Sequence, residues 1–154
     1  METTTDARTI RVFLLDDHEA FLRGISAVIG AQADIEVVGN AHTAQEALGA
    51  LAACNPDIAV LDIRLDGPDM HDGRRSGIDV CRDIRSTHPE VACLMLTAFA
   101  DDSALVESAI AGAAAYVLKQ INGTDLLESI RLVADGEQLL DPDTVQEALH
   151  RLAS

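Results

Sequence analysis

The sequence predicts an α/β protein built on a doubly wound parallel sheet of five strands, with helices on both faces. Short apolar runs alternate with helical patterns along the chain, which is typical of repeated β-α units. The apolar runs are almost uninterrupted, as expected for parallel strands that are buried on both faces. A length of 154 residues suits one ordinary domain.

The first two strands and helices follow from the spacing of apolar residues. Ile10–Leu15 is apolar at every position but one and predicts a buried strand. A helix from about residue 18 to 30 follows, because apolar residues recur there at helical spacing. Ile35–Gly39 contains one acid and predicts a strand nearer an edge. Thr43 begins a second helix, where Thr43 and Glu46 have the spacing of a capping box.

The third and fourth units show the same alternation. Ile58–Ile63 and Val91–Leu96 are predicted strands of ordinary length, apolar at every position except Asp62. Between them, Gly77–Thr87 carries apolar residues at helical spacing and predicts a helix. Asp101 caps the next helix, since its short carboxylate can accept hydrogen bonds from the first turn, and Gly112 ends it.

One more strand and two helices complete the pattern. Ala115–Leu118 is the fifth predicted strand. Thr124 or Asp125 caps a helix that runs to about residue 134. Asp141 and Pro142 have the order typical of a helix start, an acidic cap followed by proline, and predict a last helix to about residue 152.

Composition excludes several classes of protein. Asp and Glu outnumber Lys and Arg by 26 to 11, and the formal net charge of −15 argues against a nucleic-acid-binding surface. No apolar run is long enough to span a bilayer and no secretory signal precedes the first strand, so we expect a soluble cytoplasmic protein. Cys54, Cys81 and Cys93 have no metal-binding spacing and are predicted to be reduced core residues.

Polar residues collect at the predicted carboxyl ends of the strands, where open parallel sheets bind their ligands. Five of them form this group: Asp16, Asp17, Asp62, Thr97 and Lys119. Carboxylates held close together repel one another unless a cation binds, and Mg²⁺ suits a site of oxygen ligands and a phosphate. One carboxylate can then act as a nucleophile toward phosphorus, while Lys119 and Thr97 hold the phosphoryl oxygens.

Four segments at these strand ends resemble the receiver domain of two-component response regulators. They are residues 12–18 (VFLLDDH), 56–62 (PDIAVLD), 96–98 (LTA) and 112–119 (GAAAYVLK). The first and last segments are most similar to the NarL/FixJ (LuxR-type) branch, whose members usually carry a C-terminal DNA-binding domain. The resemblance implies a flavodoxin-like sheet in the order 2-1-3-4-5.

The resemblance also divides the chain. We expect the receiver domain to occupy residues 9–136, after a disordered tail at residues 1–8. Residues 137–154 are expected to form a C-terminal helix or linker toward an output domain that this sequence lacks.

For the acidic residues, the resemblance implies specific roles. Asp62 would accept a phosphoryl group from a phosphohistidine of a sensor histidine kinase. Asp17 and Asp62, with the backbone carbonyl of Arg64, would bind Mg²⁺. Asp16 would act mainly through a metal-bound water.

Three further residues would respond to the phosphoryl group. Lys119 would pair with it, Thr97 would hydrogen-bond it, and Tyr116 would turn inward as an aromatic switch.

The family implies a switch with slow self-catalysed phosphotransfer and autodephosphorylation, not a metabolic enzyme. The chain would form a homodimer and control transcription through the missing DNA-binding domain. The alternative is a stand-alone interaction or dimerisation module that does not need phosphate.

Two features depart from the family pattern. Gln120 follows Lys119 where many members have a cis proline, so we expect a trans peptide there. The segment 66–76 is longer than the usual family loop and is either an open loop or a lid. In this family, the residues two past the acceptor Asp and two past the Thr flank the approach of an in-line water. Here they are Arg64 and Phe99, and their size predicts slow dephosphorylation.

Other motifs receive plainer interpretations. Asp57, beside a proline, is interpreted as a turn residue, and His18 as a solvated residue in the first turn of a helix. The acidic residues of segment 66–76 lack the spacing of an EF-hand. Nucleotide-binding glycine loops and a GxSxG nucleophile elbow are absent, and Arg64 stands where a haloacid-type phosphatase has its second Asp.

Overall fold

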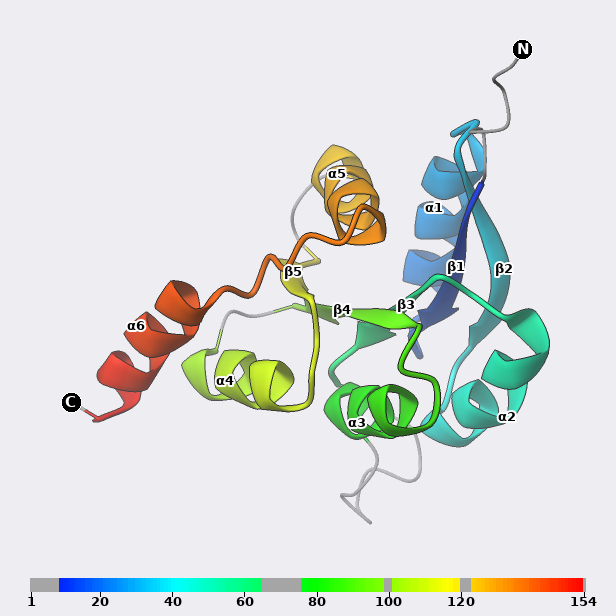
Figure 1. The fold of residues 1–154 in the computed structure, drawn as a ribbon. Coiled ribbons are helices and arrows are strands. Elements are labelled where there is room, and N and C mark those ends of the chain that lie inside the picture. The colour runs from blue at the N-terminus through cyan, green and yellow to red at the C-terminus, as the bar shows by residue number, and fades with distance from the viewer. Residues whose placement is uncertain (1–8, 65–75, 99–100, 120–122, 154) are drawn as a thin grey trace.

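A computed structural model describes residues 9–64, 76–98, 101–119 and 123–153 of the chain. Five strands form one flavodoxin-like parallel sheet in the order β2-β1-β3-β4-β5, which confirms the predicted fold class and order (Figure 1). The strands are β1 (Ile10–Leu15), β2 (Ile35–Ala41), β3 (Ile58–Asp62), β4 (Ala92–Thr97) and β5 (Ala115–Leu118).

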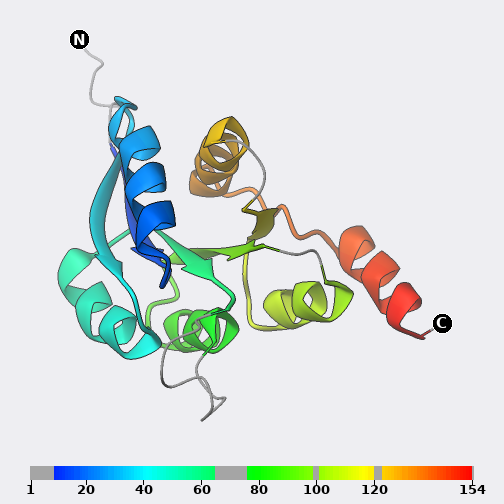
Figure 2. The ribbon, with the colours of Figure 1, turned by 180° about the vertical axis from the view of Figure 1, so that it is seen from behind.

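Helices cover both faces of this sheet. Their bounds are α1 (Glu19–Gly30), α2 (Ala44–Cys54), α3 (Gly77–Thr87), α4 (Asp102–Ile110), α5 (Gly123–Ala134) and α6 (Pro142–Ala153). Figures 1 and 2 show α1 and α5 on one face, and α2, α3 and α4 on the other. The sixth helix, α6, lies beside α4, beyond the edge that β5 forms.

Two apolar cores separate the sheet from its helix layers. Alternate residues of β1 enter opposite cores, since side chains of a strand point to opposite faces. Phe13 and Leu15 pack in the core that α2 and α3 cover, whereas Val12 and Leu14 pack in the core that α1 and α5 cover. Burial on both faces explains why the strands are almost uninterrupted apolar runs.

The helix starts differ in two respects from the prediction. The hydroxyl of Thr43 accepts a hydrogen bond from the N–H of Glu46, as expected. The carboxylate of Glu46 accepts from the N–H of His42, however, so the predicted capping box is not closed. A complete capping box joins Ser76 and Asp79 at the start of α3, where none was predicted.

Several element boundaries also differ from the predicted ones. β2 runs to Ala41, two residues farther than expected, because it pairs with β1 as far as Leu15. β4 is shifted by one residue and includes Thr97, which pairs with Leu118. β3 ends one residue before its predicted end. α5 begins at Gly123, ahead of both predicted capping residues.

The last helix is confirmed, and α6 packs against α4. The carboxylate of Asp141 accepts a hydrogen bond from the N–H of Thr144, so it caps the helix as predicted. Ala148 of α6 is fully buried. Arg151 forms two hydrogen bonds with the carboxylate of Asp102, at 2.8 and 2.9 Å. Part of the segment predicted as a linker therefore lies on the receiver fold.

The prediction of core cysteines holds for Cys81 and Cys93, whereas Cys54 is only partly buried against the core. Cys54, Cys81 and Cys93 are all free thiols, and the last two are buried. Among the described residues, none of the helices combines the length and apolar character that a membrane span requires.

Candidate functional site

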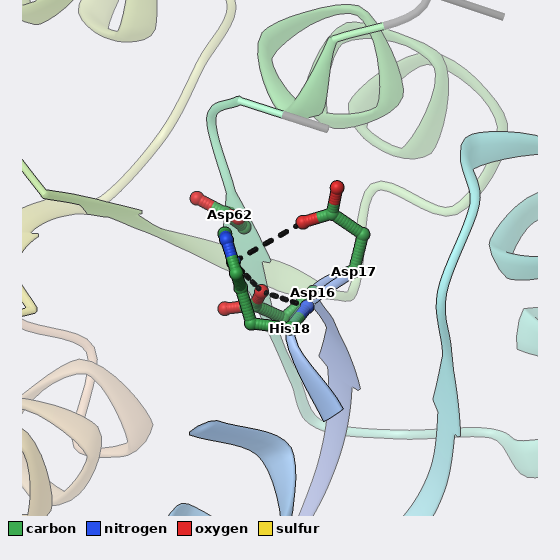
Figure 3. A group of neighbouring side chains, drawn as sticks. All are labelled: Asp16, Asp17, His18 and Asp62. Carbon is green, nitrogen blue, oxygen red and sulfur yellow. Dashed lines mark hydrogen bonds and ion pairs between the residues drawn. The ribbon is translucent and has the colours of Figure 1, made fainter. Parts of the chain in front are cut away.

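Four acidic or imidazole side chains meet at the carboxyl ends of β1 and β3 (Figure 3). Asp16, Asp17 and His18 directly follow β1, and Asp62 is the last residue of β3. Their ligand atoms all lie within 4.8 Å of one another. Asp16 and Asp62 are buried, and Asp17 is half-buried. These strands are neighbours at the centre of the sheet, so the predicted carboxylate group forms as expected.

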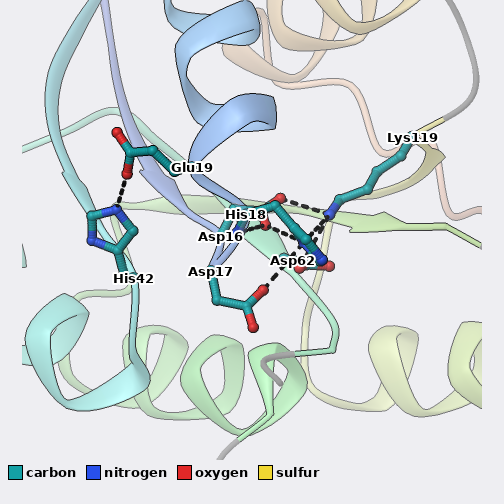
Figure 4. A network of polar contacts seen from close by, with 7 residues as sticks. All are labelled: Asp16, Asp17, His18, Glu19, His42, Asp62 and Lys119. Carbon is teal, nitrogen blue, oxygen red and sulfur yellow. Dashed lines mark hydrogen bonds and ion pairs between the residues drawn. The ribbon is translucent and has the colours of Figure 1, made fainter. Parts of the chain in front are cut away.

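Lys119 reaches this group from the end of β5 (Figure 4). Its ammonium Nζ lies 2.7 Å from Oδ2 of Asp16 and 3.2 Å from Oδ2 of Asp62. The ring of Phe21 lies beneath the ammonium, with 4.7 Å between Nζ and the ring centroid. One cation therefore bridges two buried carboxylates, and aromatic contact holds it in place.

Burial and charge set the ionisation of this pair. Burial, reinforced by the charge of Asp16, raises the pKa of Asp62 to about 7, although Lys119 acts in the opposite direction. Burial alone would lower the pKa of Lys119, but its contacts with Asp16 and Asp62 raise it. A carboxylate that loses its ordinary acidity in this way is typical of a functional site.

His18 takes a different place from the one predicted. It precedes the first residue of α1 as its N-cap, and its side chain is 56% exposed. Its ring nitrogen Nδ1 nevertheless lies 3.1 Å from Oδ1 of Asp16 and 3.2 Å from Oδ1 of Asp17. The ring is exposed to solvent as predicted, but the residue is the N-cap and not part of the first turn, and one edge of the ring faces the carboxylates.

Thr97 and Tyr116 connect the site to α4. Thr97 is buried at the end of β4, and its carbonyl accepts the N–H of Lys119 at 2.7 Å. The hydroxyl of Tyr116 donates to the carbonyl of Asp101 and accepts from its N–H, both at 3.2 Å. Burial raises the pKa of Tyr116. Since Asp101 caps α4, this contact joins β5 to the start of that helix.

Gly77 lies against the site, and the sequence did not indicate this role. Its N–H donates to the carbonyl of Ile63 at 3.0 Å. A Cβ atom built at Gly77 would overlap the backbone carbonyl of Asp62. The first residue of α3 must therefore be glycine for the helix to approach the end of β3 this closely.

The remaining predicted residues lie elsewhere or outside the described residues. The carboxylate of Asp57 accepts the N–H of Arg11 at 3.0 Å, at the amino end of β3, which confirms a structural role. Arg64 is exposed, two residues beyond Asp62. Phe99, Gln120 and nearly all of segment 66–76 fall outside the described residues, so the predictions for them stay predictions.

Comparison with known proteins agrees with this geometry. Residues 12–131 match the family described as the response regulator receiver domain. The DNA-binding transcriptional activator DevR/DosR of Mycobacterium tuberculosis is 42% identical over 132 residues, which cover 86% of this chain and 58% of that protein. The response regulator VraR of Staphylococcus aureus is 31% identical over 94% of this chain and 66% of its own length. This chain thus spans roughly three-fifths to two-thirds of these relatives.

Solved structures extend the similarity to the fold. A LuxR-family two-component response regulator from Aurantimonas sp. SI85-9A1 has a TM-score of 0.79 and 29% identity, covering 95% of this chain and 99% of that one. The receiver domain of the response regulator NarL from Mycobacterium tuberculosis has a TM-score of 0.76 and 27% identity, covering 84% of this chain and 99% of that one. The chain therefore belongs to the family of response regulator receiver domains.

Proposed function

We propose that Asp62 is a phosphoacceptor and that its phosphorylation requires Mg²⁺. The observation that carries this proposal is the pair of buried carboxylates, Asp16 and Asp62, bridged by the single ammonium of Lys119. Nucleophilic attack requires an ionised carboxylate, and burial raises the pKa of Asp62 to about 7, so with Lys119 alone the carboxyl is only partly ionised near neutral pH. A divalent cation at the same edge would supply the missing positive charge.

The donor set fits Mg²⁺, a hard cation that binds oxygen ligands. Asp17 and Asp62 would bind it together with the backbone carbonyl of Arg64, and Asp16 would bind through water. When bound, the ion neutralises charge on the carboxylates and on the phosphoryl group. The ammonium of Lys119 lies 2.7 Å from Asp16 and 3.2 Å from Asp62. It is therefore close enough to pair with a phosphoryl group on Asp62.

In the transfer step, a carboxylate oxygen of Asp62 attacks phosphorus of a phosphohistidine in a sensor histidine kinase. The bond from phosphorus to the donor nitrogen breaks, its electron pair stays on nitrogen, and the nitrogen then takes up a proton. Lys119 pairs with one phosphoryl oxygen and the hydroxyl of Thr97 hydrogen-bonds another, so charge in the transition state is held from two sides. Slow hydrolysis of the acyl phosphate by water would reset the site.

Phosphorylation of Asp62 would change the conformation of Thr97 and, through it, of the start of α4. Tyr116 already holds the backbone of Asp101, the residue that caps this helix. Movement of Thr97 toward the phosphoryl group would alter that contact and the surface around α4, which would change self-association. We propose that the chain regulates transcription through a DNA-binding domain on a longer protein or a partner, because its relative DevR/DosR is a DNA-binding transcriptional activator.

Acetyl phosphate with Mg²⁺ tests the proposal, with intact mass and peptide mapping as the readout. One phosphoryl group is expected on Asp62 and none in the Asp62→Asn variant. The Asp17→Asn variant should also lose the reaction, because a neutral amide is a poorer ligand for the ion. The Asp34→Asn variant is the control, since Asp34 forms an exposed ion pair with Arg131 and does not belong to the carboxylate group around Asp62. Undiminished phosphorylation of Asp62→Asn would refute the assignment, and dimerisation without any phosphorylation would favour the stand-alone module.

A further inference from the structure

One ring nitrogen lies inside the carboxylate group, and the proposed phosphoacceptor chemistry does not use it. Nδ1 of His18 contacts Asp16 and Asp17 at 3.1 and 3.2 Å, and it lies 3.4 Å from Nζ of Lys119 (Figures 3 and 4). The backbone N–H of His18 also donates to Oδ1 of Asp16 at 2.8 Å, which fixes the residue relative to that carboxylate. Contacts of both the backbone N–H and the ring nitrogen Nδ1 therefore hold His18 at the site.

These three contacts of Nδ1 cannot all be favourable at once. If Nδ1 carries a proton, it donates to a carboxylate but opposes the ammonium of Lys119, which has only donors. If Nδ1 is unprotonated, it accepts from Lys119, but its lone pair then faces the carboxylate oxygens. A divalent cation bound between the ring and the carboxylates removes this conflict, because every lone pair then points at the ion.

The spacing of the ligand atoms agrees with a metal site. In an octahedron with bonds of about 2.1 Å, neighbouring ligands are about 3.0 Å apart and opposite ligands about 4.2 Å apart. Nδ1 of His18 lies at neighbouring-ligand distance, 3.2 Å, from one oxygen of Asp17, which is a proposed direct ligand. It also lies 3.1 Å from one oxygen of Asp16, the carboxylate proposed to act through a metal-bound water. With Asp62 included, all four ligand atoms fall within 4.8 Å. A contraction of less than about 1 Å in the widest spacing would bring these atoms into one coordination sphere.

We propose that His18 is a direct nitrogen ligand, and that the site therefore binds divalent transition metals such as Mn²⁺ and Co²⁺ more tightly than Mg²⁺. The inference rests on the proposed function, because it concerns the same cation. Imidazole suits transition metals, whereas Mg²⁺ prefers oxygen and keeps its waters. Removing the ring should lower the affinity for Co²⁺ and Mn²⁺ much more than the affinity for Mg²⁺.

His42 provides a matched control within the same region. It is also a partly exposed histidine near the end of a strand, but its Nε2 pairs with Oε1 of Glu19 at 2.6 Å (Figure 4). It is not a member of the group of potential metal ligands around Asp62. The His42→Gln variant therefore changes the same residue type without changing the proposed ligand set.

Metal titrations of the unphosphorylated chain test the inference, with calorimetry for Co²⁺ and Mg²⁺ and pulsed electron paramagnetic resonance for Mn²⁺. Wild type should bind Co²⁺ more tightly than Mg²⁺, and bound Mn²⁺ should show coupling to a nitrogen nucleus. His18→Gln should lose that coupling and at least about tenfold in Co²⁺ affinity, the loss typical even of residues that only orient a ligand. Its Mg²⁺ affinity should change by less than about threefold.

The possible outcomes separate the two proposals. Bound Mn²⁺ without nitrogen coupling in wild type, or an unchanged Co²⁺ affinity in His18→Gln, would overturn the role of His18 while leaving the phosphoacceptor site intact. His42→Gln should retain the nitrogen coupling, and its loss there instead would also overturn the assignment. Failure of every divalent ion to bind wild type would refute both this inference and the metal requirement of the proposed function.

Discussion

Carboxylates meet cations in two contrasting ways in this molecule. On the surface, Asp34 and Asp102 each have an arginine of their own, Arg131 and Arg151, with two hydrogen bonds per pair. The hydrogen bond from the arginine lowers the pKa of each of these carboxyls. At the carboxyl edge of the sheet, two buried carboxylates share one ammonium, and the pKa of Asp62 is raised.

This difference indicates that the surface pairs join parts of the fold, whereas the buried group has the charge imbalance of a ligand-binding site. The surface pairs tie α5 to the loop before β2, and α6 to the start of α4, with charge balanced within each pair. The buried group carries more negative than positive charge, which costs folding free energy unless a cation binds. A protein retains such an arrangement where chemistry requires it.

The largest expected effect comes from neutralising the buried acceptor. In the folded chain Asp62 keeps a proton up to about pH 7, whereas the unfolded chain releases it near its ordinary pKa of 3.8. The free energy of unfolding contributed by this group therefore falls as pH rises from about 4 to 7 and is flat above that. Asp62→Asn should remove this pH-dependent loss, so the free energy of unfolding at pH 8 should increase by on the order of 4 kcal/mol at most.

Denaturant unfolding in the presence of a chelator, between pH 5 and 8, measures this effect. The stability difference between Asp62→Asn and wild type should grow with pH and level off above about 7. Asp34→Asn is the matched control and should show no such growth, because the pKa of Asp34 is shifted the other way. A difference that stays constant across the range would contradict the unbalanced-charge account.

Removal of the shared cation should have an effect of similar size and opposite sign. Lys119→Met leaves Asp16 and Asp62 buried without their common partner, which typically costs about 3–5 kcal/mol. At pH 5, where Asp62 is protonated, the loss should be much smaller than at pH 8. Chemical unfolding at the two pH values provides the comparison, and equal losses at both would show that Lys119 acts through packing on Phe21 instead.

The smallest effect is expected at the surface pair of α6. Arg151→Ala removes an exposed pair whose charges water already screens, so the free energy of unfolding should hardly change. Amide hydrogen exchange along residues 142–153 should rise, because α6 loses its charged contact with α4 but keeps the buried Ala148. Unchanged exchange in that segment would mean that apolar packing alone holds the helix.

The sequence predicted the sheet and the composition of the site because both follow from simple rules. Uninterrupted apolar runs predict doubly covered parallel strands, and the carboxyl ends of such strands meet at one edge. Asp16, Asp62 and Lys119 could therefore be placed together from their positions alone.

Details that depend on tertiary packing could not be predicted in this way. The ring of His18 turns back toward the carboxylates, a choice of side-chain conformation that helical spacing does not indicate. The close approach of Gly77 to Asp62 depends on how α3 docks against β3. The position of α6 on α4 depends on a contact between helices that are distant in sequence, through Arg151 and Asp102.

A titration of the Asp62 carboxyl carbon by nuclear magnetic resonance tests the central claim most directly. In the metal-free protein the account predicts a midpoint near pH 7, since burial and the charge of Asp16 oppose ionisation. Saturating Mg²⁺ should move that midpoint well below 7, because a bound divalent cation favours the ionised form. A metal-free midpoint in the ordinary range for aspartate, or one that Mg²⁺ leaves unchanged, would contradict the claim that this buried group is a site awaiting a cation.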